Sequence, residues 1–489
     1  IPSEAELSPR NRGVEPWEKL SEEQKALYAK MQEVFAAFLD HTDDQVGRLI
    51  EFLETQDLLD DTLIVFLSDN GASQEGGKHG TTNELAYFNL MPLQVDDMIQ
   101  HLDEIGGPNY YNNYPWGWSQ VGNTPLRFYK QNTYEGGIRD PLIMHWPNGI
   151  DDAGGIRDHY HHVIDLMPTI LDIVGVESPE NFQGVDQQPV EGTSMRYTFP
   201  ANAVDTPTTR PKQYYEMMGH RAIWSDGWKA VTMHRKGVPF EDEEWALYDT
   251  LKDFSECHDL SASEPEKLKE MIDLWWDEAE SFNVLPLDDR GNELFFMRRE
   301  DRLPLSKPQR FLKNTPHLER FKIPDVRNRS FEIGAKVALD RDSEGVLVAS
   351  GGRTGGIVLY VANSHLVFEY NFMGSSTIVS SERKLDTGEC ELGVSYRKTA
   401  ENHGTASLYI ENKDNRDYLG EIEIDTLPYR QTMYGMDVGK DLGPTVSDKY
   451  VGPFTFTGNL EWIEFRLEND RDDLEAASAV EAKNALADQ

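Results

Sequence analysis

Apolar residues near the N-terminus recur with a helical period. Ser21 and Gln24 have the spacing of a capping box, in which two side chains satisfy backbone N–H groups at the start of a helix. The apolar positions that follow keep this period: Leu27, Met31, Val34, Phe35, Phe38, Val46, Leu49, Ile50 and Leu53. We expect one long helix that lies on a sheet and leads into a strand. Residues 1–20, rich in Pro and Glu, are expected to form a surface connection.

An unbroken apolar run follows this helix and ends in polar residues. Leu63–Leu67 is continuously apolar and is followed by Ser68, Asp69, Asn70 and Gly71. Such a run predicts a strand of a parallel sheet that is covered on both faces. Because ligands of open α/β sheets bind at the carboxyl ends of strands, Asp69 and Asn70 lie where a site is expected. Their oxygen atoms suit Ca²⁺ or Mg²⁺ better than zinc, although the same residues are also typical of a turn.

The middle of the chain continues the α/β pattern. Residues 141–147 predict a second buried strand, and residues 165–175 predict a short helix. Three histidines before this helix, His159, His161 and His162, resemble a metal cluster, but we assign them to the structure.

An antiparallel subdomain is predicted next, over about residues 212–288. Ser, Asp and Gly at 225–227 predict the turn of a hairpin over residues 222–231. A strand at 245–248 and a helix with apolar residues on one face follow. With the segments before it, this subdomain completes an α/β domain that we expect to cover residues 21–300.

The hydrophobic period changes from helical to two beyond residue 328. A basic, Pro-containing linker over 301–328 precedes four alternating runs: Phe331 to Leu339, Leu366 to Phe372, Leu408 to Ile410 and Ile463 to Leu467. Many short strands predict a β-sandwich over residues 329–470. A sandwich of this kind binds sugar, or Ca²⁺ through Asp437 and Asp441, or serves as a packing module, which we prefer. The acidic, Ala-rich tail over 471–489 is expected to be a solvated helix or disordered.

Composition excludes several classes of partner. The 489 residues suffice for two or three domains, and a net charge of −39 argues against nucleic acid or anionic lipid as partners. An anionic substrate must then be held by a local basic cluster, for which Arg127, Lys130 and Arg139 are the candidates. Two cysteines give no disulfide framework, and no apolar run reaches the length of a membrane span. No signal peptide is visible at Ile1, and the cellular compartment stays open.

Several motifs together resemble the sulfatase family, over roughly the first three-fifths of the chain. They lie at residues 62–71, 75–77, 114–118, 123–130 and 134–141, and they are most similar to large bacterial arylsulfatases. The resemblance implies the C-terminal portion of an alkaline phosphatase-like sulfatase domain, and the C-terminal strands resemble the lectin-like jelly rolls appended to large arylsulfatases.

The same resemblance implies roles for individual residues. Asp69 and Asn70 would be two ligands of the active-site metal, usually Ca²⁺, with Mg²⁺ as an alternative. Lys130 would be the lysine that contacts the sulfate group and stabilises negative charge as the S–O bond breaks, and Arg127 would assist in substrate binding.

The nucleophile of the family has no credible counterpart in this chain. In sulfatases the Cys or Ser of a Cys-x-Pro-x-Arg or Ser-x-Pro-x-Arg motif is oxidised to formylglycine, yet neither Cys257 nor Cys390 is followed by Pro and Arg at those offsets. Residues 306–310 match the Ser form, but they lie after the sulfatase-like region, and we interpret the match as chance. We therefore expect a C-terminal part of a longer sulfatase, with the N-terminal half of the catalytic domain missing and little activity in the chain alone.

The expected function is hydrolysis of a sulfate ester on a small molecule or a sugar. Aryl sulfates are the substrates that the resemblance implies, while choline, steroid and polysaccharide sulfates stay open. Two alternatives remain: a phosphate or phosphonate monoester hydrolase of the same superfamily, and a catalytically silent half that binds metal or carbohydrate.

Overall fold

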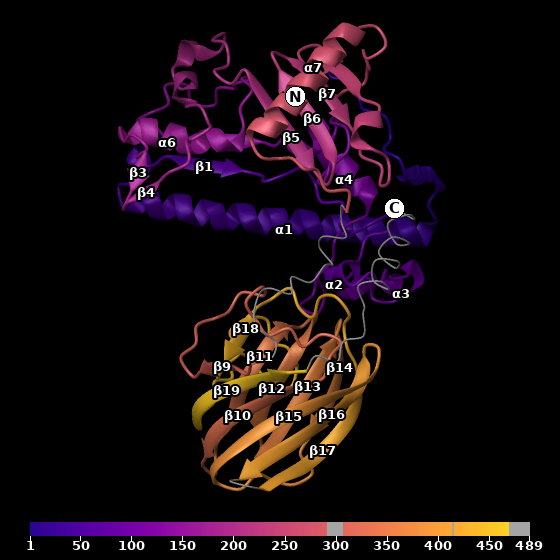
Figure 1. Cartoon of the computed structure of the whole chain (residues 1–489), viewed down its shortest axis with the longest axis vertical. Coiled ribbons are helices and arrows are strands. Elements are labelled where there is room, and N and C mark those ends of the chain that lie inside the picture. The colour runs from indigo at the N-terminus through magenta and orange to yellow at the C-terminus, as the bar shows by residue number, and fades with distance from the viewer. Residues whose placement is uncertain (291–306, 413–414, 469–489) are drawn as a thin grey trace. The chain divides into compact units, whose positions relative to one another are not determined.

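The computed structural model describes residues 1–290, 307–412 and 415–468 (Figure 1). The described residues divide into two compact units. As far as they are described, the first unit takes Ile1–Glu15, Phe35–Gln74 and Trp116–Asn292, and the second takes Pro16–Val34, Glu75–Pro115 and Glu293–Gln489. Two segments of the predicted α/β region, residues 16–34 and 75–115, thus belong to the same unit as the C-terminal strands. None of the helices in the described ranges is long and apolar enough to cross a lipid bilayer.

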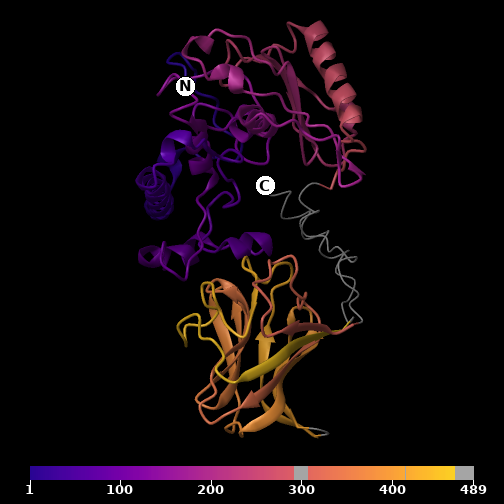
Figure 2. The ribbon, with the colours of Figure 1, turned by 90° about the vertical axis from the view of Figure 1, so that its left-hand side faces the viewer.

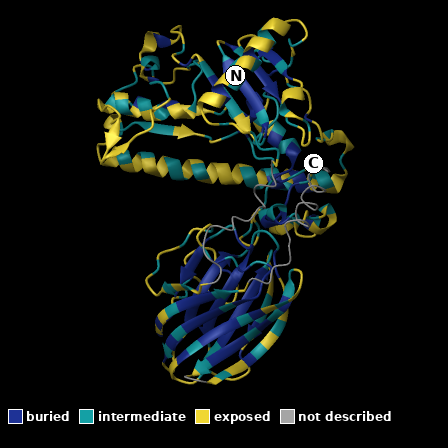
Figure 3. Ribbon diagram, in the orientation of Figure 1, coloured by how far each residue is buried: buried dark blue, intermediate teal, exposed yellow. Residues whose placement is uncertain are grey.

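The predicted long helix is α1 (Glu22–Thr55). Its capping box is confirmed, because the Gln24 N–H donates to Ser21 Oγ at 3.1 Å and the Ser21 N–H donates to Gln24 Oε1 at 3.0 Å. The expectation that the helix lies on a sheet is wrong. Only Leu27, Tyr28 and Met31 are buried, and the helix beyond them is exposed or half-buried, so it has no face covered by a sheet (Figure 3).

The predicted strand before Asp69 is β1 (Ile64–Leu67), and the predicted second strand is β2 (Leu142–His145). They pair antiparallel, with Ile64 opposite His145 and Leu67 opposite Leu142. The expectation of a parallel, fully covered sheet is therefore wrong for the described residues. Phe66 and Ile143 are 47% and 58% exposed, because no third strand in the described ranges pairs with either strand and their faces stay uncovered.

A four-stranded antiparallel sheet forms the core of the first unit. Its strands follow in the order β5 (Lys212–Met217), β6 (His220–Ser225), β7 (Trp228–Thr232) and β8 (Ala246–Asp249). The hairpin predicted at Asp226 and Gly227 is confirmed, and both residues adopt the positive φ that a two-residue hairpin turn requires. The helix α7 (Pro265–Ser281) packs on this sheet through the buried Met271, Trp275 and Ala279.

Short elements connect these sheets. The predicted short helix is confirmed as α6 (Leu166–Val174), which ends where Gly175 adopts φ +68°. The others are η1 (Trp17–Lys19), η2 (Leu59–Asp61), α2 (Glu84–Phe88), α3 (Val95–Ile99), η3 (Leu102–Glu104), α4 (Trp116–Asn123), α5 (Glu135–Ile138), η4 (Val163–Asp165), β3 (Asn181–Phe182), β4 (Val185–Asp186), η5 (Arg196–Thr198), η6 (Ala201–Ala203) and η7 (Phe240–Asp242).

The C-terminal strands of the second unit form two antiparallel sheets, visible as separate layers in Figure 2. The six-stranded sheet has the order β17-β16-β15-β10-β19-β9, and the five-stranded sheet has the order β14-β13-β12-β11-β18. Their bounds are β9 (Gln309–Leu312), β10 (Phe331–Leu339), β11 (Gly345–Gly352), β12 (Gly355–Ala362), β13 (His365–Phe372), β14 (Ser375–Ser380), β15 (Gly388–Ala400), β16 (His403–Asn412), β17 (Asn415–Asp425), β18 (Met436–Val438) and β19 (Asn459–Leu467).

One hydrophobic core joins the two sheets. Buried side chains from both sheets meet in it, for example Ile333 and Phe465 from the six-stranded sheet and Leu359 and Phe368 from the five-stranded sheet. The alternation predicted from Phe331 to Leu339 is confirmed, because these alternate positions of β10 are all buried. The jelly-roll topology itself stays a prediction.

The prediction that residues 301–328 form a linker is wrong at one point, because the strand β9 lies within this range. This strand pairs with β19, and Arg310 donates to Glu464 at 2.8 Å while its guanidinium lies 4.2 Å from the centre of the Trp462 ring. Arg310 thus pairs with a carboxylate and packs on an aromatic ring of the sheet. The basic composition of the segment does not reveal these contacts. Residues 301–306 and the predicted tail over 471–489 lie outside the described residues.

Residues 75–115 are attached to the strands of their own unit by two asparagines. The Asn83 side chain caps α2 and donates to the Thr354 carbonyl at 3.0 Å. The Asn89 amide accepts from the Arg430 N–H and donates to the Arg430 carbonyl, each at 2.9 Å. Both asparagines are buried, so these hydrogen bonds form in a site from which water is largely excluded.

Candidate functional site

The loop after β1 carries Asp69 and Asn70 and is fixed at its far end by a close backbone approach. The Gly71 N–H donates to the Gly137 carbonyl at 3.2 Å. A Cβ atom on Gly71 would lie 1.7 Å from the Gly136 carbonyl oxygen, so only glycine fits here. The Asp69 side chain is exposed and that of Asn70 is half-buried, which leaves their oxygens at the surface of the first unit.

A single asparagine connects this loop to the segment that carries Lys130. Asn123, at the end of α4, accepts from the Ala72 N–H at 3.0 Å and donates to the Phe128 and Gly136 carbonyls at 2.9 and 2.7 Å. The Lys130 N–H in turn donates to the Ala72 carbonyl at 3.1 Å. The structure therefore brings the backbone of Lys130 beside the loop of Asp69 and Asn70, although the two lie some sixty residues apart in the sequence.

Asp140 is a neighbour of Asp69 that the sequence analysis missed. Burial, followed by the negative charges of Asp69 and Glu135, raises the pKa of Asp140 to about 7. The sequence contained a signal for this proximity. Asp69 lies just after the first predicted strand, and Asp140 lies immediately before the second. Only the antiparallel pairing of β1 and β2 brings those two ends together.

The donors at this loop fit a hard divalent cation in kind but not in number. Asp69 and Asn70 offer a carboxylate and an amide oxygen, which suit Ca²⁺ or Mg²⁺. Ca²⁺ takes about six to eight oxygen ligands, however. Within the described ranges no three or more His, Cys, Asp or Glu side chains form a group that could hold a metal ion. These residues therefore supply part of a coordination shell, and we derive no chemical step through the metal.

Arg127 lies in contact with aromatic side chains. Its Nη1 donates to the Tyr248 hydroxyl at 3.1 Å, and its guanidinium lies 4.9 Å from the centre of the Tyr134 ring. The structure thus places Arg127 in the aromatic packing next to α5. Its role in substrate binding stays a prediction.

A buried ion triad supports the turn that Gly71 touches. Glu135, at the start of α5, and Glu256 both lie 2.8 Å from Lys229 Nζ on β7, and all three side chains are almost or fully buried. Glu256 also accepts from the Glu135 N–H at 2.7 Å. The sequence analysis missed this triad, although a lysine between Trp228 and Ala230 in an apolar strand is unusual.

The pKa values of the triad reflect burial and mutual charge. Burial raises the pKa of Glu256 to about 7, because the opposing effect of Lys229 is only partial and Glu135 adds a like charge. Burial favours the neutral form of Lys229 as well, but the charges of Glu135 and Glu256 raise its pKa above the usual value. The triad therefore holds the α5 turn with a lysinium between two carboxyl groups.

His161, one of the three histidines before α6, and His79 make contacts within the protein. His161 Nδ1 lies 2.8 Å from Asp165 Oδ2, and its Nε2 lies 3.0 Å from the Tyr197 hydroxyl. In the second unit, His79 Nδ1 lies 2.6 Å from the Tyr28 hydroxyl. These contacts agree with our assignment of the histidines to the structure.

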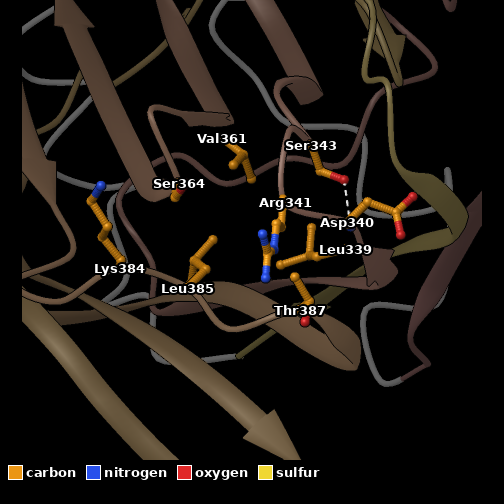
Figure 4. Close-up of a pocket in the computed structure, with 9 residues that line it drawn as sticks. All are labelled: Leu339, Asp340, Arg341, Ser343, Val361, Ser364, Lys384, Leu385 and Thr387. Carbon is orange, nitrogen blue, oxygen red and sulfur yellow. Dashed lines mark hydrogen bonds between the residues drawn. The ribbon is translucent and has the colours of Figure 1, made fainter.

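A small cavity lies among the loops of the second unit (Figure 4). Its volume is about 120 Å³, and its lining comes from the connections β10–β11, β12–β13 and β14–β15. The lining residues are Leu339, Asp340, Arg341, Ser343, Val361, Ser364, Lys384, Leu385 and Thr387. Each water molecule occupies about 30 Å³ in the liquid, so the cavity has room for a few waters or one small group, not for a sugar ring.

Two family models match parts of the first three-fifths of the chain. Residues 8–176 match the family model described as Sulfatase, and residues 126–280 match the model described as N-sulphoglucosamine sulphohydrolase, C-terminal. Both matches include Lys130, whose backbone the structure places beside the loop after β1. The region from residue 8 to residue 280 is therefore similar to sulfatases.

Three curated relatives illustrate the range of this similarity. An uncharacterized sulfatase of Schizosaccharomyces pombe is 33% identical over 57% of this chain and 48% of its own length. An arylsulfatase of Klebsiella aerogenes is 29% identical, over 38% of each chain. An N-acetylglucosamine-6-O-sulfatase of Bacteroides thetaiotaomicron is 25% identical over 55% of this chain and 39% of its own length. The chain thus spans half or less of the length of these relatives.

Proposed function

We propose that the protein to which these residues belong hydrolyses sulfate esters, as an arylsulfatase-type enzyme. The observation that carries the proposal is the backbone junction at Ala72, which brings Lys130 beside the loop of Asp69 and Asn70 in a region similar to sulfatases. A cation and two hard oxygen donors at one place suit an anionic ester that is bound next to a divalent metal.

Each residue has a distinct part in this proposal. The Lys130 ammonium group binds sulfate oxygens and stabilises the negative charge that grows as the S–O bond breaks. Asp69 and Asn70 hold Ca²⁺, or Mg²⁺, together with ligands outside these residues. Once bound, such an ion supplies a Lewis acid for the ester and its nucleophile. Arg127 contributes to substrate binding.

The nucleophile is proposed to be a formylglycine outside residues 1–489. Neither cysteine of the chain has the required motif, and Cys390 is buried in the core between the two C-terminal sheets. Burial also raises the pKa of the Cys390 thiol to about 11, which keeps it protonated and a poor nucleophile at neutral pH.

The class of sulfate ester is the most specific part of the proposal. The arylsulfatase of Klebsiella aerogenes supports an aryl sulfate, and the N-acetylglucosamine-6-O-sulfatase of Bacteroides thetaiotaomicron supports a sugar sulfate. The phosphate or phosphonate monoester hydrolase and the silent binding half remain the alternatives. The names of the relatives favour sulfate over both.

The test uses the native, full-length gene product. We expect release of sulfate from 4-nitrophenyl sulfate or a sulfated sugar, and little release of phosphate from 4-nitrophenyl phosphate. Lys130→Ala should lower kcat about 100-fold, since it removes a group that stabilises transition-state charge. Lys252→Ala is the matched control, because Lys252 is an exposed lysine of the same unit that pairs with Asp249. A preference for phosphate, or equal kcat values for both variants, would overturn the proposal.

A further inference from the structure

Two arginines of the second unit converge on one sulfur atom. Arg320 Nη1 lies 3.9 Å and Arg430 Nη1 lies 3.7 Å from Met433 Sδ. A thioether sulfur is only a weak acceptor and carries no charge. Two guanidinium groups therefore approach the same uncharged sulfur atom.

Neither arginine has a carboxylate partner. Among the residues that the structure describes, no Asp or Glu oxygen lies within 4.0 Å of a nitrogen of Arg320 or Arg430. The neighbouring Arg327, by contrast, is paired with Asp325 through contacts of 2.6 and 3.0 Å. Burial, followed by the charges of Arg320 and Arg327, lowers the pKa of Arg430 to about 10. The charges of Glu84 and Glu75 oppose this shift without a direct ion pair to Arg430. The two arginines thus lack a directly paired carboxylate, in a chain whose net charge is −39.

The backbone and aromatic neighbours hold the two arginines in place. Asn89 binds the N–H and the carbonyl of Arg430, and the Arg430 guanidinium lies 3.8 Å from the centre of the Phe88 ring. The Arg320 guanidinium lies 4.6 Å from the centre of the Phe321 ring, which is 62% exposed. An exposed aromatic ring therefore lies next to the arginine pair.

We propose that Arg320 and Arg430 form a binding site for a sulfate group of a sulfated saccharide, with Phe321 against the sugar ring. A tetrahedral oxyanion accepts hydrogen bonds from two guanidinium groups at once and neutralises their mutual repulsion. Aromatic faces are suited to the apolar face of a sugar. The choice of sulfate rests on the proposed function. The two arginines belong to the second unit, whereas Asp69 and Lys130 belong to the first.

The binding test measures migration of the full chain in native gels that contain dextran sulfate or unsulfated dextran. We expect retardation by dextran sulfate only, with an apparent Kd about tenfold weaker in Arg320→Gln and in Arg430→Gln, which corresponds to one lost charge-assisted contact. Arg383→Gln is the matched control, because it removes one positive charge from an exposed residue of the same unit that already pairs with Asp386 and Asp417. Equal weakening in the control, or none in the two variants, would overturn the site.

Thermal unfolding separates a binding role from a structural one. Without polymer, Arg320→Gln should leave Tm unchanged or raise it by about 1–3 °C, because the variant removes a like-charge contact. Addition of dextran sulfate should raise the Tm of the native sequence and leave that of the variant nearly constant. A Tm that falls by more than about 5 °C in the variant without polymer would instead assign the pair to the structure.

Two further arms separate this inference from the proposed function. A carboxylated polymer, polygalacturonate, should bind more weakly than dextran sulfate, and equal Arg-dependent binding of both would overturn the assignment to sulfate. Lys130→Ala should keep the full affinity for dextran sulfate, and its loss would overturn the separate site. If the full-length protein releases no sulfate while Arg320-dependent binding persists, the proposed function fails and this site stands.

Discussion

Lys229 Nζ lies 2.8 Å from Glu256 Oε1, and both side chains are fully buried. A second carboxylate, that of Glu135, lies at the same distance from the ammonium group. Taking these charges out of water is costly, and the cost is offset only while the partners stay together. The triad therefore fixes the α5 turn, and through Gly136 and Gly137 it supports the loop that carries Asp69 and Asn70.

Removal of the shared cation should destabilise the first unit strongly. Lys229→Met leaves two carboxyl groups buried without a counter-charge, and we expect a loss of about 3–5 kcal/mol in the free energy of unfolding. Lys252→Met, which removes an exposed lysine paired with Asp249, should cost less than about 1 kcal/mol. Urea unfolding of both variants provides the comparison, and similar midpoints would show that the triad does not stabilise this unit.

The triad should also make stability depend on pH. The pKa of Glu256 is about 7 in the folded chain, against an ordinary value of 4.5. Between these values the folded state binds more protons than the unfolded state, so stability falls as pH rises from about 4.5 through 7. Glu256→Gln keeps a neutral side chain at every pH. Its Tm should therefore rise relative to that of the native sequence between pH 5 and pH 8, as measured by differential scanning fluorimetry.

The control for this titration is Glu270→Gln, at an exposed position of α7 paired with Lys267. Its Tm difference from the native sequence should stay nearly constant over the same pH range. If the Tm of Glu256→Gln instead falls relative to that of the native sequence as pH rises, this would contradict the raised pKa of Glu256.

Sequence patterns were most informative where a segment's own residues decide its structure. The capping box of Ser21, the stop at Gly175 and the hairpin at Asp226 all depend on neighbouring residues, and all three are confirmed. The alternation from Phe331 to Leu339 was equally reliable, because a strand with one face in a core must alternate.

Patterns failed where the outcome depends on distant residues. The apolar run of Leu63–Leu67 is the same in a parallel and in an antiparallel sheet, so its pairing with residues 142–145 could not be predicted. The approach of Asp140 to Asp69 follows from that pairing, and the contact of Lys229 with Glu135 spans almost a hundred residues. For Asp69, Asn70 and Lys130, the family resemblance supplied the expectation, and the physical reason for their grouping is the approach of Gly71 to Gly136.

Substitution at Gly71 tests this approach directly. A Cβ atom in Gly71→Ala would lie 1.7 Å from the Gly136 carbonyl oxygen, so one backbone segment must move. We expect a loss of about 1–3 kcal/mol, as for other overpacked sites. The hydrogen bond from the Lys130 N–H to Ala72 should weaken as well, which hydrogen exchange of the Lys130 amide would report as faster exchange.

A glycine in open space provides the contrast. Gly47 lies inside α1 with no other atom within 4 Å of its Cβ position. Gly47→Ala should therefore stabilise the chain by about 0.5–1 kcal/mol through helix propensity. Unchanged exchange of the Lys130 amide in Gly71→Ala would show that the glycine contact does not hold the two segments together.

Calcium binding measures how much of a metal site these residues provide on their own. Asp69 and Asn70 supply two of the six to eight oxygen ligands that Ca²⁺ usually takes, so isothermal titration of the isolated chain should give a Kd of about 10⁻⁴ M or weaker. Asp69→Ala should abolish the binding that remains, whereas Asp96→Ala, at an exposed aspartate of the second unit, should leave it unchanged. Tight stoichiometric binding that disappears in Asp69→Ala would contradict this expectation, because the described residues would then complete a coordination shell that their carboxylates do not form in this structure.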